Sequence, residues 1–419
     1  MTGEIHSPAH LADPRAALVR MRSKSAGWHP ALRGDRPGLL DWLGAVRSAR
    51  AGRVAAIAWI GLCHVACVIQ MCADPLAGVP RDWRGKVQPG DFQQVSPGQW
   101  ASPWVRPDFA FDELIYSWRT DRPGDAFRLH LQVRFGPSDE TGWLYAGSWG
   151  AVTNLAASRR PPAFDRGVLD MDWLRLKARA AEFRFQVTGA GAAALANPPA
   201  LTVIATDNHA APSQGRAEPA RVAARVLDVP LRRQLDARGQ WMKDRCQSAA
   251  LASAMEYYGQ SVLLEEIVRL THDPEYDYPG IWPRVIGAAR EFGFEGSIER
   301  FRDWAAVRRA LAENQMILCS IRMKEGDCQA PPYASMGNHI VVLCGVTDDG
   351  RAVVTDSALG KSGAGYLCQW LQSDFETVWM RTKGGIAMVL CPPPGAAERR
   401  IQSLPPFPAD RALPAGDDH

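Results

Sequence analysis

The stretch at residues 245–259, RCQSAALASAMEYYG, constrains the fold more than any other part of the sequence. Leu251, Met255 and Tyr258 recur at positions i, i+4 and i+7, which predicts a helix that buries one face. Cys246 would then lie at the helix N-terminus, where unpaired backbone N–H groups favour a thiolate. A lone cysteine at such a place is more often a buried structural residue, so its chemistry depends on partners elsewhere in the chain.

The first part of the chain shows features of an exported protein. Residues 1–53 mix Arg, Pro, Gly and Ala without periodicity, which predicts a disordered or basic extension. Residues 54–74 are apolar and follow several arginines, a pattern typical of an export signal or a membrane anchor, with a buried core helix as the alternative. We therefore expect a periplasmic, cell-envelope or secreted protein, with association to a membrane through this segment as the alternative.

A β domain is predicted next. Residues 75–107 are rich in Pro, Gly, Gln and Ser, which predicts a linker. Apolar and polar residues then alternate over residues 127–135 and 183–187, the period-two pattern of strands with one buried face. Several short strands without a helix of useful length predict an antiparallel β-sandwich domain over residues 108–206.

The pattern changes again after a second predicted linker, residues 207–227. Helical periodicity comes first and apolar strands follow, at residues 247–258, 261–270, 282–292 and 303–313 and then at 316–321, 340–346 and 352–355. Helices followed by strands indicate an α+β domain, over residues 228–392. The Pro-rich tail at residues 393–419 cannot build a core and is predicted to be disordered.

Composition excludes several classes of function. Charged residues make up 22% of the 419 residues and the net charge is +3, values that do not indicate a nucleic-acid binder. The nine cysteines form no CxxC pair and no cluster at zinc spacing, so a structural metal is not expected. No Gly-rich phosphate loop occurs either. The sequence therefore predicts neither a nucleic-acid partner nor a cofactor.

A cysteine nucleophile needs a base, usually a histidine, and the α+β domain contains two. His272 lies in a polar segment with turn residues, where a solvated side chain is expected. His339 leads directly into the apolar run at residues 340–344, which places its imidazole at the mouth of a buried strand. A structural histidine would fit there as well, so the sequence around His339 leaves both roles open.

An acid that could orient His339 follows in the next strand. Residues 347–350 form a predicted turn, so that the strands on either side pair as an antiparallel hairpin. If Val346 pairs with Arg351, Asp356 lies opposite Val341 and on the face of His339, about 7 to 8 Å away along the diagonal. A β-bulge would break this relation. A carboxylate at that place would hold the imidazole in one orientation and stabilise its protonated form.

The oxyanion of a tetrahedral intermediate needs a donor beside the backbone N–H of Cys246. Gln234 and Gln240 both precede the nucleophile, and either could supply a side-chain amide. Glutamine is also common on surfaces, so the choice between them stays open.

The residues from 228 to 392 resemble the C39-like branch of the papain-like cysteine peptidases. The matching pieces occur in the order Val229-Pro230 through Gln234, Cys246 with Ala249 to Gly259, Gly280-Ile281-Trp282-Pro283, Gly337-Asn338-His339, and Val354-Thr355-Asp356. The resemblance implies a papain-like α+β fold, with Cys246 as nucleophile, His339 as base and then acid, Asp356 as orienting residue and Gln234 as oxyanion donor. The preceding β region looks like the N-terminal sandwich of some exported bacterial members.

Two positions depart from the pattern of that family. Members usually have Gly-Pro after the nucleophile, whereas Gln247 and Ser248 stand here, and their side chains could crowd the cleft or narrow its specificity. Members usually have Pro after the acid, whereas Ser357 stands here. Neither change removes a reacting atom.

We therefore expect an enzyme, a thiol-dependent hydrolase that cleaves a peptide or amide bond of a peptide or protein substrate through an acyl-enzyme intermediate. A binding module on the same fold, which captures a peptide or cell-wall fragment without turnover, is one alternative. An acyltransferase of the transglutaminase-like type is another. The sequence does not show which cysteines pair, and Cys319 and Cys344, on predicted core strands, could be plain hydrophobic residues.

Overall fold

The computed structural model describes residues 80–401 and 404, apart from 121, 123, 154–162, 193, 211–223, 362 and 363. The predicted extension at residues 1–53 and the apolar segment at 54–74 lie outside the described residues. Among the helices that are described, none has the length and apolar character needed to cross a membrane. The two domains described below belong to one unit by their contacts.

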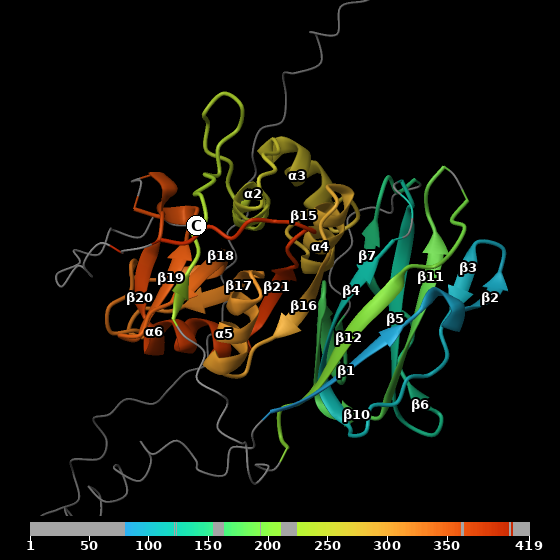
Figure 1. Cartoon of the computed structure of the whole chain (residues 1–419). Coiled ribbons are helices and arrows are strands. Elements are labelled where there is room, and N and C mark those ends of the chain that lie inside the picture. Colours follow the sequence, from blue (N-terminus) through green and yellow to red (C-terminus); the bar gives the residue numbers. More distant parts are fainter. Residues whose placement is uncertain are drawn as a thin grey trace, which may run out of the picture. The chain divides into compact units, whose positions relative to one another are not determined.

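Two antiparallel sheets form the N-terminal β domain, coloured blue to green in Figure 1. The first sheet has the order β1-β12-β4-β10-β9-β8. Its strands are β1 (Arg81–Val87), β12 (Ala200–Asp207), β4 (Phe111–Arg119), β10 (Trp173–Ala180), β9 (Gly167–Asp170) and β8 (Ala163–Phe164). The second sheet has the order β2-β3-β11-β5-β6, with β7 also paired to β5. Its strands are β2 (Gln93–Ser96), β3 (Gln99–Ala101), β11 (Glu182–Gly189), β5 (Phe127–Gly136), β6 (Asp139–Glu140) and β7 (Leu144–Trp149).

Aromatic side chains join the two sheets. Phe111 of β4 meets Phe183 of β11 edge to face at 5.9 Å between ring centroids, and Tyr116 meets Phe185 in the same way at 5.6 Å. All four side chains are at most 1% exposed. The alternation seen in the sequence thus marks strands whose apolar faces share one core.

The prediction of a linker at residues 75–107 is wrong. Three strands lie within it, since β1 pairs with β12 and β3 pairs with both β2 and β11. These strands stand at or beside the edges of their sheets, and nearly all of their side chains are exposed or half-buried. Their sequences are therefore polar, and composition alone cannot separate such strands from a loop.

The C-terminal domain, yellow to red in Figure 1, is built on an antiparallel sheet with the order β16-β21-β17-β18-β19-β20. Its strands are β16 (Gly296–Arg300), β21 (Ile386–Leu390), β17 (Met316–Met323), β18 (Met336–Val346), β19 (Arg351–Thr355) and β20 (Cys368–Leu371), and the short β13 (Arg225–Val226) also pairs with β18. A separate two-stranded ladder joins β14 (His272–Asp273) and β15 (Tyr278–Pro279).

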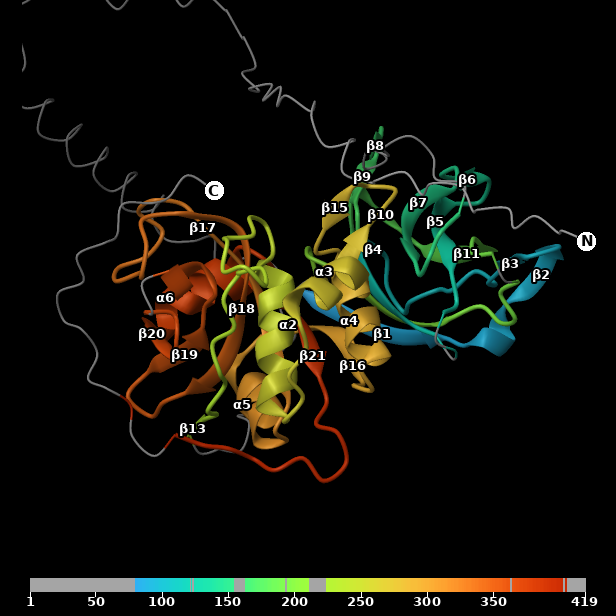
Figure 2. The ribbon, with the colours of Figure 1, turned by 90° about the horizontal axis from the view of Figure 1, so that it is seen from above.

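The helices of this domain are α2 (Cys246–Tyr257), α3 (Leu264–Thr271), α4 (Trp282–Glu291), α5 (Trp304–Ala312) and α6 (Gln372–Glu376). Short helical turns are η3 (Ala358–Lys361) and η4 (Thr377–Arg381) in this domain and η2 (Pro89–Asp91) in the β domain. Helix α2 packs against β17 and β18 and against α3 and α4, as Figure 2 shows from above. Nearly all side chains of α2 are buried, and not one face only as predicted, because its alanines and serines let neighbours approach from every side.

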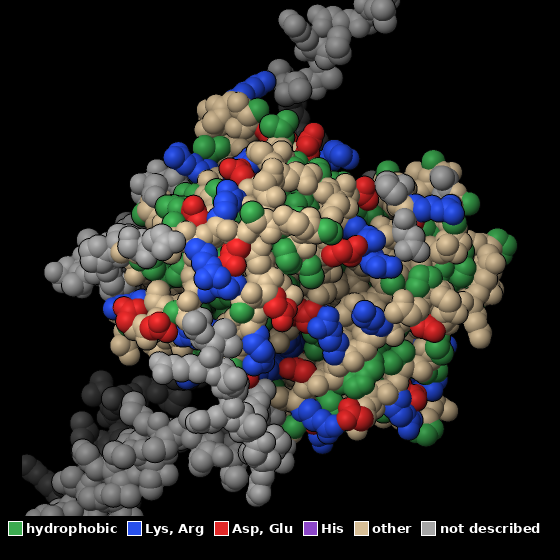
Figure 3. All heavy atoms as spheres, in the orientation of Figure 1, with side chains coloured by type: hydrophobic (Ala, Val, Ile, Leu, Met, Phe, Trp, Pro, Cys, Tyr) green, Lys and Arg blue, Asp and Glu red, His purple; other side chains and the backbone are tan. Residues whose placement is uncertain are grey.

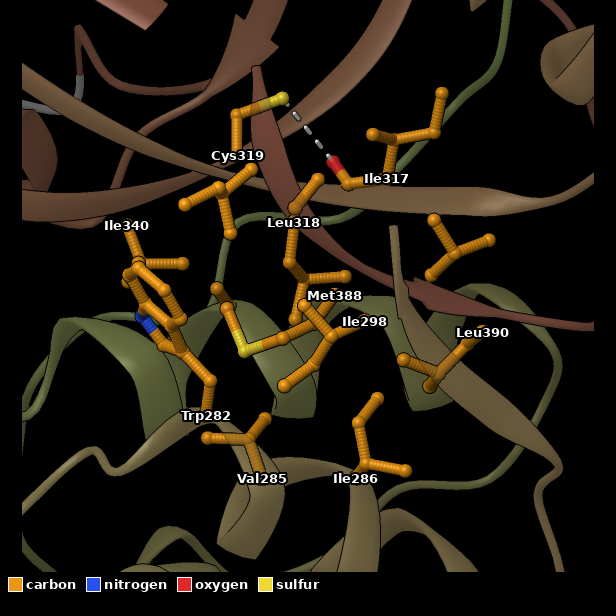
Figure 4. Packing of buried hydrophobic residues seen from close by; sticks show 14 of the residues in the cluster. Trp282, Val285, Ile286, Ile298, Ile317, Leu318, Cys319, Ile340, Met388 and Leu390 are labelled. Carbon is orange, nitrogen blue, oxygen red and sulfur yellow. Dashed lines mark hydrogen bonds between the residues drawn. The ribbon is translucent and has the colours of Figure 1, made fainter. Parts of the chain in front are cut away.

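Helix α4 closes the core over the sheet. Trp282, Val285 and Ile286 of α4 point toward Ile298, Leu318 and Met388 on the strands in Figure 4. On the face of the molecule in Figure 3, Lys and Arg side chains are interspersed with Asp and Glu, and neither sign dominates.

The segments predicted as a second linker and as a disordered tail are partly structured. Asp207 still belongs to β12 and residues 225–226 already form β13, so the linker predicted over 207–227 is too long at both ends. Residues 393–401 of the predicted tail return to the domain, where Ile401 N–H donates to the Val226 carbonyl. The rest of the tail, except residue 404, lies outside the described residues.

The hairpin of β18 and β19 differs from the expected register in two ways that cancel. Val346 pairs with Ala352 and not with Arg351, which in a regular ladder would turn Asp356 away from the face of His339. A bulge at Cys344 shifts the register by one residue, so that Val342 pairs with Thr355. Asp356 follows directly and returns to the side of His339.

Candidate active site

Cys246 is the first residue of α2 and is half-buried. The described residues offer no hydrogen bond to its backbone N–H, and Arg245 before it provides no side-chain cap. The N-terminus of α2 therefore keeps its unpaired donors and partial positive charge for a group bound beside the thiol.

His339 lies on β18 with its ring beside Cys246. Its Nε2–H donates to Asp356 Oδ1 at 2.7 Å, because a carboxylate oxygen can only accept. Nδ1 is then left on the side of the pockets that His339 and Cys246 line together, while the Cys246 thiol itself donates to Gln247 Oε1 at 3.5 Å. Burial lowers the pKa of His339, but the Asp356 carboxylate and Cys246 outweigh it and raise the pKa to about 10. The site thus favours an imidazolium next to the sulfur.

Asp356 is fully buried after β19 and is held by several donors besides the imidazole. The Ala358 N–H donates to Oδ1 at 2.9 Å, and the Tyr333 hydroxyl donates to Oδ2 at 3.3 Å. These bonds fix the carboxylate in one orientation and satisfy its charge inside the domain.

Gln234 connects the nucleophile and the acid. Its Oε1 accepts the Arg245 N–H at 3.0 Å, which turns its Nε2 toward Ser357, where it donates to Oγ at 3.1 Å. One N–H of the amide remains, and the side chain lines a pocket together with Cys246. Gln240, the other predicted donor, is exposed in a turn and does not line either pocket at the thiol.

Two pockets meet at the thiol and share Cys246, His339, Asn338 and Tyr278. One, of about 220 Å³, is completed by Gln234, Trp241, Asp244, Met336, Gly337 and Ala358. The other, of about 90 Å³, is completed by Asp170, Met171, Asp172, Trp173, Gln247, Pro279, Gly280, Trp282, Ser320, Ile340 and Lys383. The β domain thus forms part of the wall of the second pocket, hereafter the small pocket.

The two residues that depart from the family pattern after Cys246 have different surroundings. Ser248 is fully buried against Thr271, at 2.9 Å between the two hydroxyl oxygens, and does not enter the cleft. Gln247 lines the small pocket and packs on Gly280, where an added Cβ would lie 2.7 Å from Gln247 Cδ. Only Gln247 narrows the cleft.

The remaining candidates lie elsewhere. His272 is half-buried and its Nε2 lies 3.1 Å from Asp277 Oδ1, away from both pockets. All six cysteines in the described part are free, and burial raises the pKa of Cys344 to about 12 and that of Cys319 well above its ordinary value. No group of three or more His, Cys, Asp or Glu side chains within the described residues is placed to hold a metal ion.

Sequence reasoning missed several residues of the small pocket. Asp172 and Trp173 come from the β domain, and Lys383 follows η4, so no local spacing links them to the thiol. Trp282 was noted only as part of a family segment, without a role. Their placement follows from the packing of the two domains, which a single sequence does not display.

Comparison with sequence families agrees with this geometry. Residues 226–386 match the model described as Peptidase_C39 like family, and residues 81–206 match the model described as Peptidase C39 N-terminal domain. Residues 226–386 of the chain belong to the C39-like peptidase family. Its C39 peptidase-like fold carries extensive antiparallel sheets. None of the curated proteins searched matches the chain.

Several solved structures are similar to the C39-like part. One is a double glycine motif protease from an AMS/PCAT transporter in complex with the leader peptide, at 19% identity, covering 42% of this chain and all of that chain with a TM-score of 0.28. The peptidase domain of Streptococcus ComA, a bi-functional ABC transporter involved in quorum sensing, matches at 17% identity over 37% of this chain and 96% of that chain, with a TM-score of 0.28. A putative C39-like peptidase from Bacillus anthracis matches at 13% identity over 40% and 96%, with a TM-score of 0.30.

Proposed function

We propose that this C39-like protein is a cysteine peptidase that cleaves a peptide or amide bond through Cys246, His339 and Asp356. The observation that carries the proposal is the buried imidazole of His339, which contacts the Asp356 carboxylate through Nε2 and lines both pockets together with Cys246. A thiol at a helix N-terminus beside an oriented imidazolium is the arrangement that generates a nucleophilic thiolate.

The reaction begins when the Cys246 sulfur attacks the carbonyl carbon and the carbonyl oxygen becomes an oxyanion. The free Cys246 N–H and the remaining N–H of Gln234 are the donors for that oxygen. The His339 imidazolium gives its Nδ1 proton to the leaving amine, and a thioester remains on Cys246. Neutral His339 then takes a proton from water, whose oxygen displaces the sulfur and releases the acid.

We also infer that the two sheets of the N-terminal domain form a β-sandwich and that the C-terminal domain has the papain-like α+β arrangement. Aromatic contacts between the two sheets and the helix α2 packed against β17 and β18 support this view. The apolar segment at residues 54–74 supports export or anchoring in a membrane, which a fusion of residues 1–80 to a reporter enzyme would test.

Labelling of the full chain with an electrophilic peptide probe tests the chemistry. We expect covalent modification of Cys246 in the wild type and none in Cys246→Ala or His339→Ala, while circular dichroism shows that both variants fold. Cys391, also half-buried, is the matched control, and Cys391→Ala should keep full labelling. Labelling that persists in Cys246→Ala would contradict the proposal.

Two other outcomes would replace the peptidase proposal by a different function. A labelled enzyme that joins an added amine to a peptide more readily than it hydrolyses the peptide would be an acyltransferase. A folded wild type that retains peptides but reacts with no probe would be a binding module.

A further inference from the structure

Lys383 lies in the small pocket as a cation without a carboxylate partner. Its side chain is only 8% exposed, and among the described residues it forms no ion pair. One of its N–H groups donates to Asn338 Oδ1 at 3.3 Å. A buried ammonium ordinarily finds an acid or several acceptors, so the remaining two donors are available to a ligand in the pocket.

The surroundings hold the ammonium in place from both domains. Lys383 Nζ lies 5.0 Å from the ring centroid of Trp173 in the β domain and 5.7 Å from that of Trp282 in α4. The two indoles stand 6.2 Å apart and attract the cation through their ring faces. Gly385 fixes the turn after Lys383, because its φ is +68° and a Cβ would meet the Phe301 carbonyl.

The charges around the pocket favour an anion. Asp172 and Asp170 favour the charged form of Lys383, whereas burial, Arg175 and Arg322 lower its pKa. Asp170 is already paired with Arg175 at 3.0 Å. Asp172 accepts the backbone N–H of Trp282 at 2.5 Å, and burial raises its pKa to about 7, which weakens its negative charge at neutral pH. One of the two acids is thus paired and the other is only partly ionised at neutral pH, so neither fully offsets the charge of Lys383.

We propose that the small pocket is a substrate subsite in which the Lys383 ammonium binds a carboxylate, with Trp173 of the β domain as one wall. The subsite rests on the proposed function, since the same pocket is lined by Cys246 and His339. The carboxylate is either the side chain of an Asp or Glu residue of the peptide or its free C-terminus. The β domain thereby becomes a determinant of specificity and not only an attachment.

Binding to the full-length Cys246→Ala protein tests the subsite without depending on turnover. A randomised pool of N-acetylated hexapeptides is passed over the protein, once with C-terminal amides and once with free C-termini, and the retained peptides are sequenced. We expect Asp and Glu to be enriched over Asn and Gln at one position of the amide pool, or free C-termini to be retained over amides. Two peptides that differ only in the selected acid and its amide, each titrated singly, should differ about tenfold in Kd.

Variants of one side chain give the control. Lys383→Met keeps an unbranched side chain between the two indoles, removes the charge, and should reduce the difference within the pair to less than about twofold, while Lys383→Arg should retain most of it. Lys324→Met, at an exposed lysine outside both pockets, should leave the difference unchanged. Melting curves show whether each variant folds.

The proposal is wrong if the Cys246→Ala protein binds peptides with Asp or Glu no better than those with Asn or Gln, and free C-termini no better than amides. This result can be observed without any lysine variant. It is equally wrong if the preference survives in folded Lys383→Met, or if Lys is enriched at one position in place of an acid, which would assign recognition to Asp172. The peptidase proposal fails by a different result, namely that the wild type reacts with no probe.

Discussion

Replacement of Asp356 by Asn separates the charge of this residue from its geometry. Asn is nearly isosteric with Asp, so its carbonyl oxygen can still accept the Ala358 N–H and the His339 Nε2–H, while its NH₂ group meets the Tyr333 hydroxyl. The variant should therefore keep the orientation of the imidazole and lose the negative charge beside it.

The expected change in the pKa of His339 is large. An increase from the ordinary 6.5 to about 10 stabilises the imidazolium by roughly 5 kcal/mol, at about 1.36 kcal/mol for each pKa unit. The Asp356 carboxylate causes most of this increase in the pKa, against the effect of burial, and Cys246 causes the rest. Without the carboxylate we expect the pKa of His339 to fall below about 8, since burial then disfavours the charged ring.

Nuclear magnetic resonance measures this pKa directly from the ring ¹³Cε1 signal of His339 in the full chain, assigned with His339→Gln. Asp348→Asn, in the exposed turn of the hairpin, is the matched control and should leave the pKa near 10. A pKa that stays above about 9 in folded Asp356→Asn would refute the electrostatic reasoning.

The same shift predicts how stability depends on pH. The folded-state pKa of His339 lies above its ordinary 6.5, so the stabilising contribution is fully present below pH 6.5 and is lost as the pH rises through about 10. The difference in unfolding free energy between wild type and Asp356→Asn, measured in urea, should therefore shrink between these pH values.

Two further substitutions test the cleft. Gln234→Glu keeps an oxygen for Arg245 N–H but removes the amide donors, so we expect kcat to fall about 100-fold with little change in KM; a loss below about threefold would speak against an oxyanion role. Gly280→Ala places a Cβ 2.7 Å from Gln247 Cδ at a φ of +84°, whereas Gly326 has the same φ and no neighbour within 4 Å. Urea unfolding should show about 1 kcal/mol lost in Gly326→Ala and about 1 to 2 kcal/mol more in Gly280→Ala, and equal losses would contradict the crowding.

The residues at the thiol could be predicted because each carries a local signal. Cys246 opens a helix, His339 begins an apolar strand, and Asp356 ends the next one. The contact between His339 and Asp356 also depends on the bulge at Cys344, and no sequence pattern predicts that bulge. A close approach of β13 accompanies the bulge, since a Cβ at Gly345 would meet the Arg225 carbonyl at 2.2 Å, and such contacts are visible only after folding.

The limits of the domains were harder to predict than their cores. Strands β1 to β3 show no clear alternation because nearly all of their side chains are exposed or half-buried. Their pairing with β11 and β12 therefore overrides a polar composition. Lys383 and Trp173 gave no signal for a related reason. Each is an ordinary residue in its own segment, and only the packing of two domains brings them to one pocket.

The return of residues 399–401 to β13 brings both ends of the C39-like domain to one place. Asp228 N–H donates to the Arg399 carbonyl, and Ile401 N–H donates to the Val226 carbonyl. One side of β13 pairs with β18, and the other is covered by this segment. A chain cut at residue 392 would leave a bare strand edge open to self-association, whereas a domain excised with residue 401 included could be transplanted or circularly permuted with its ends already adjacent.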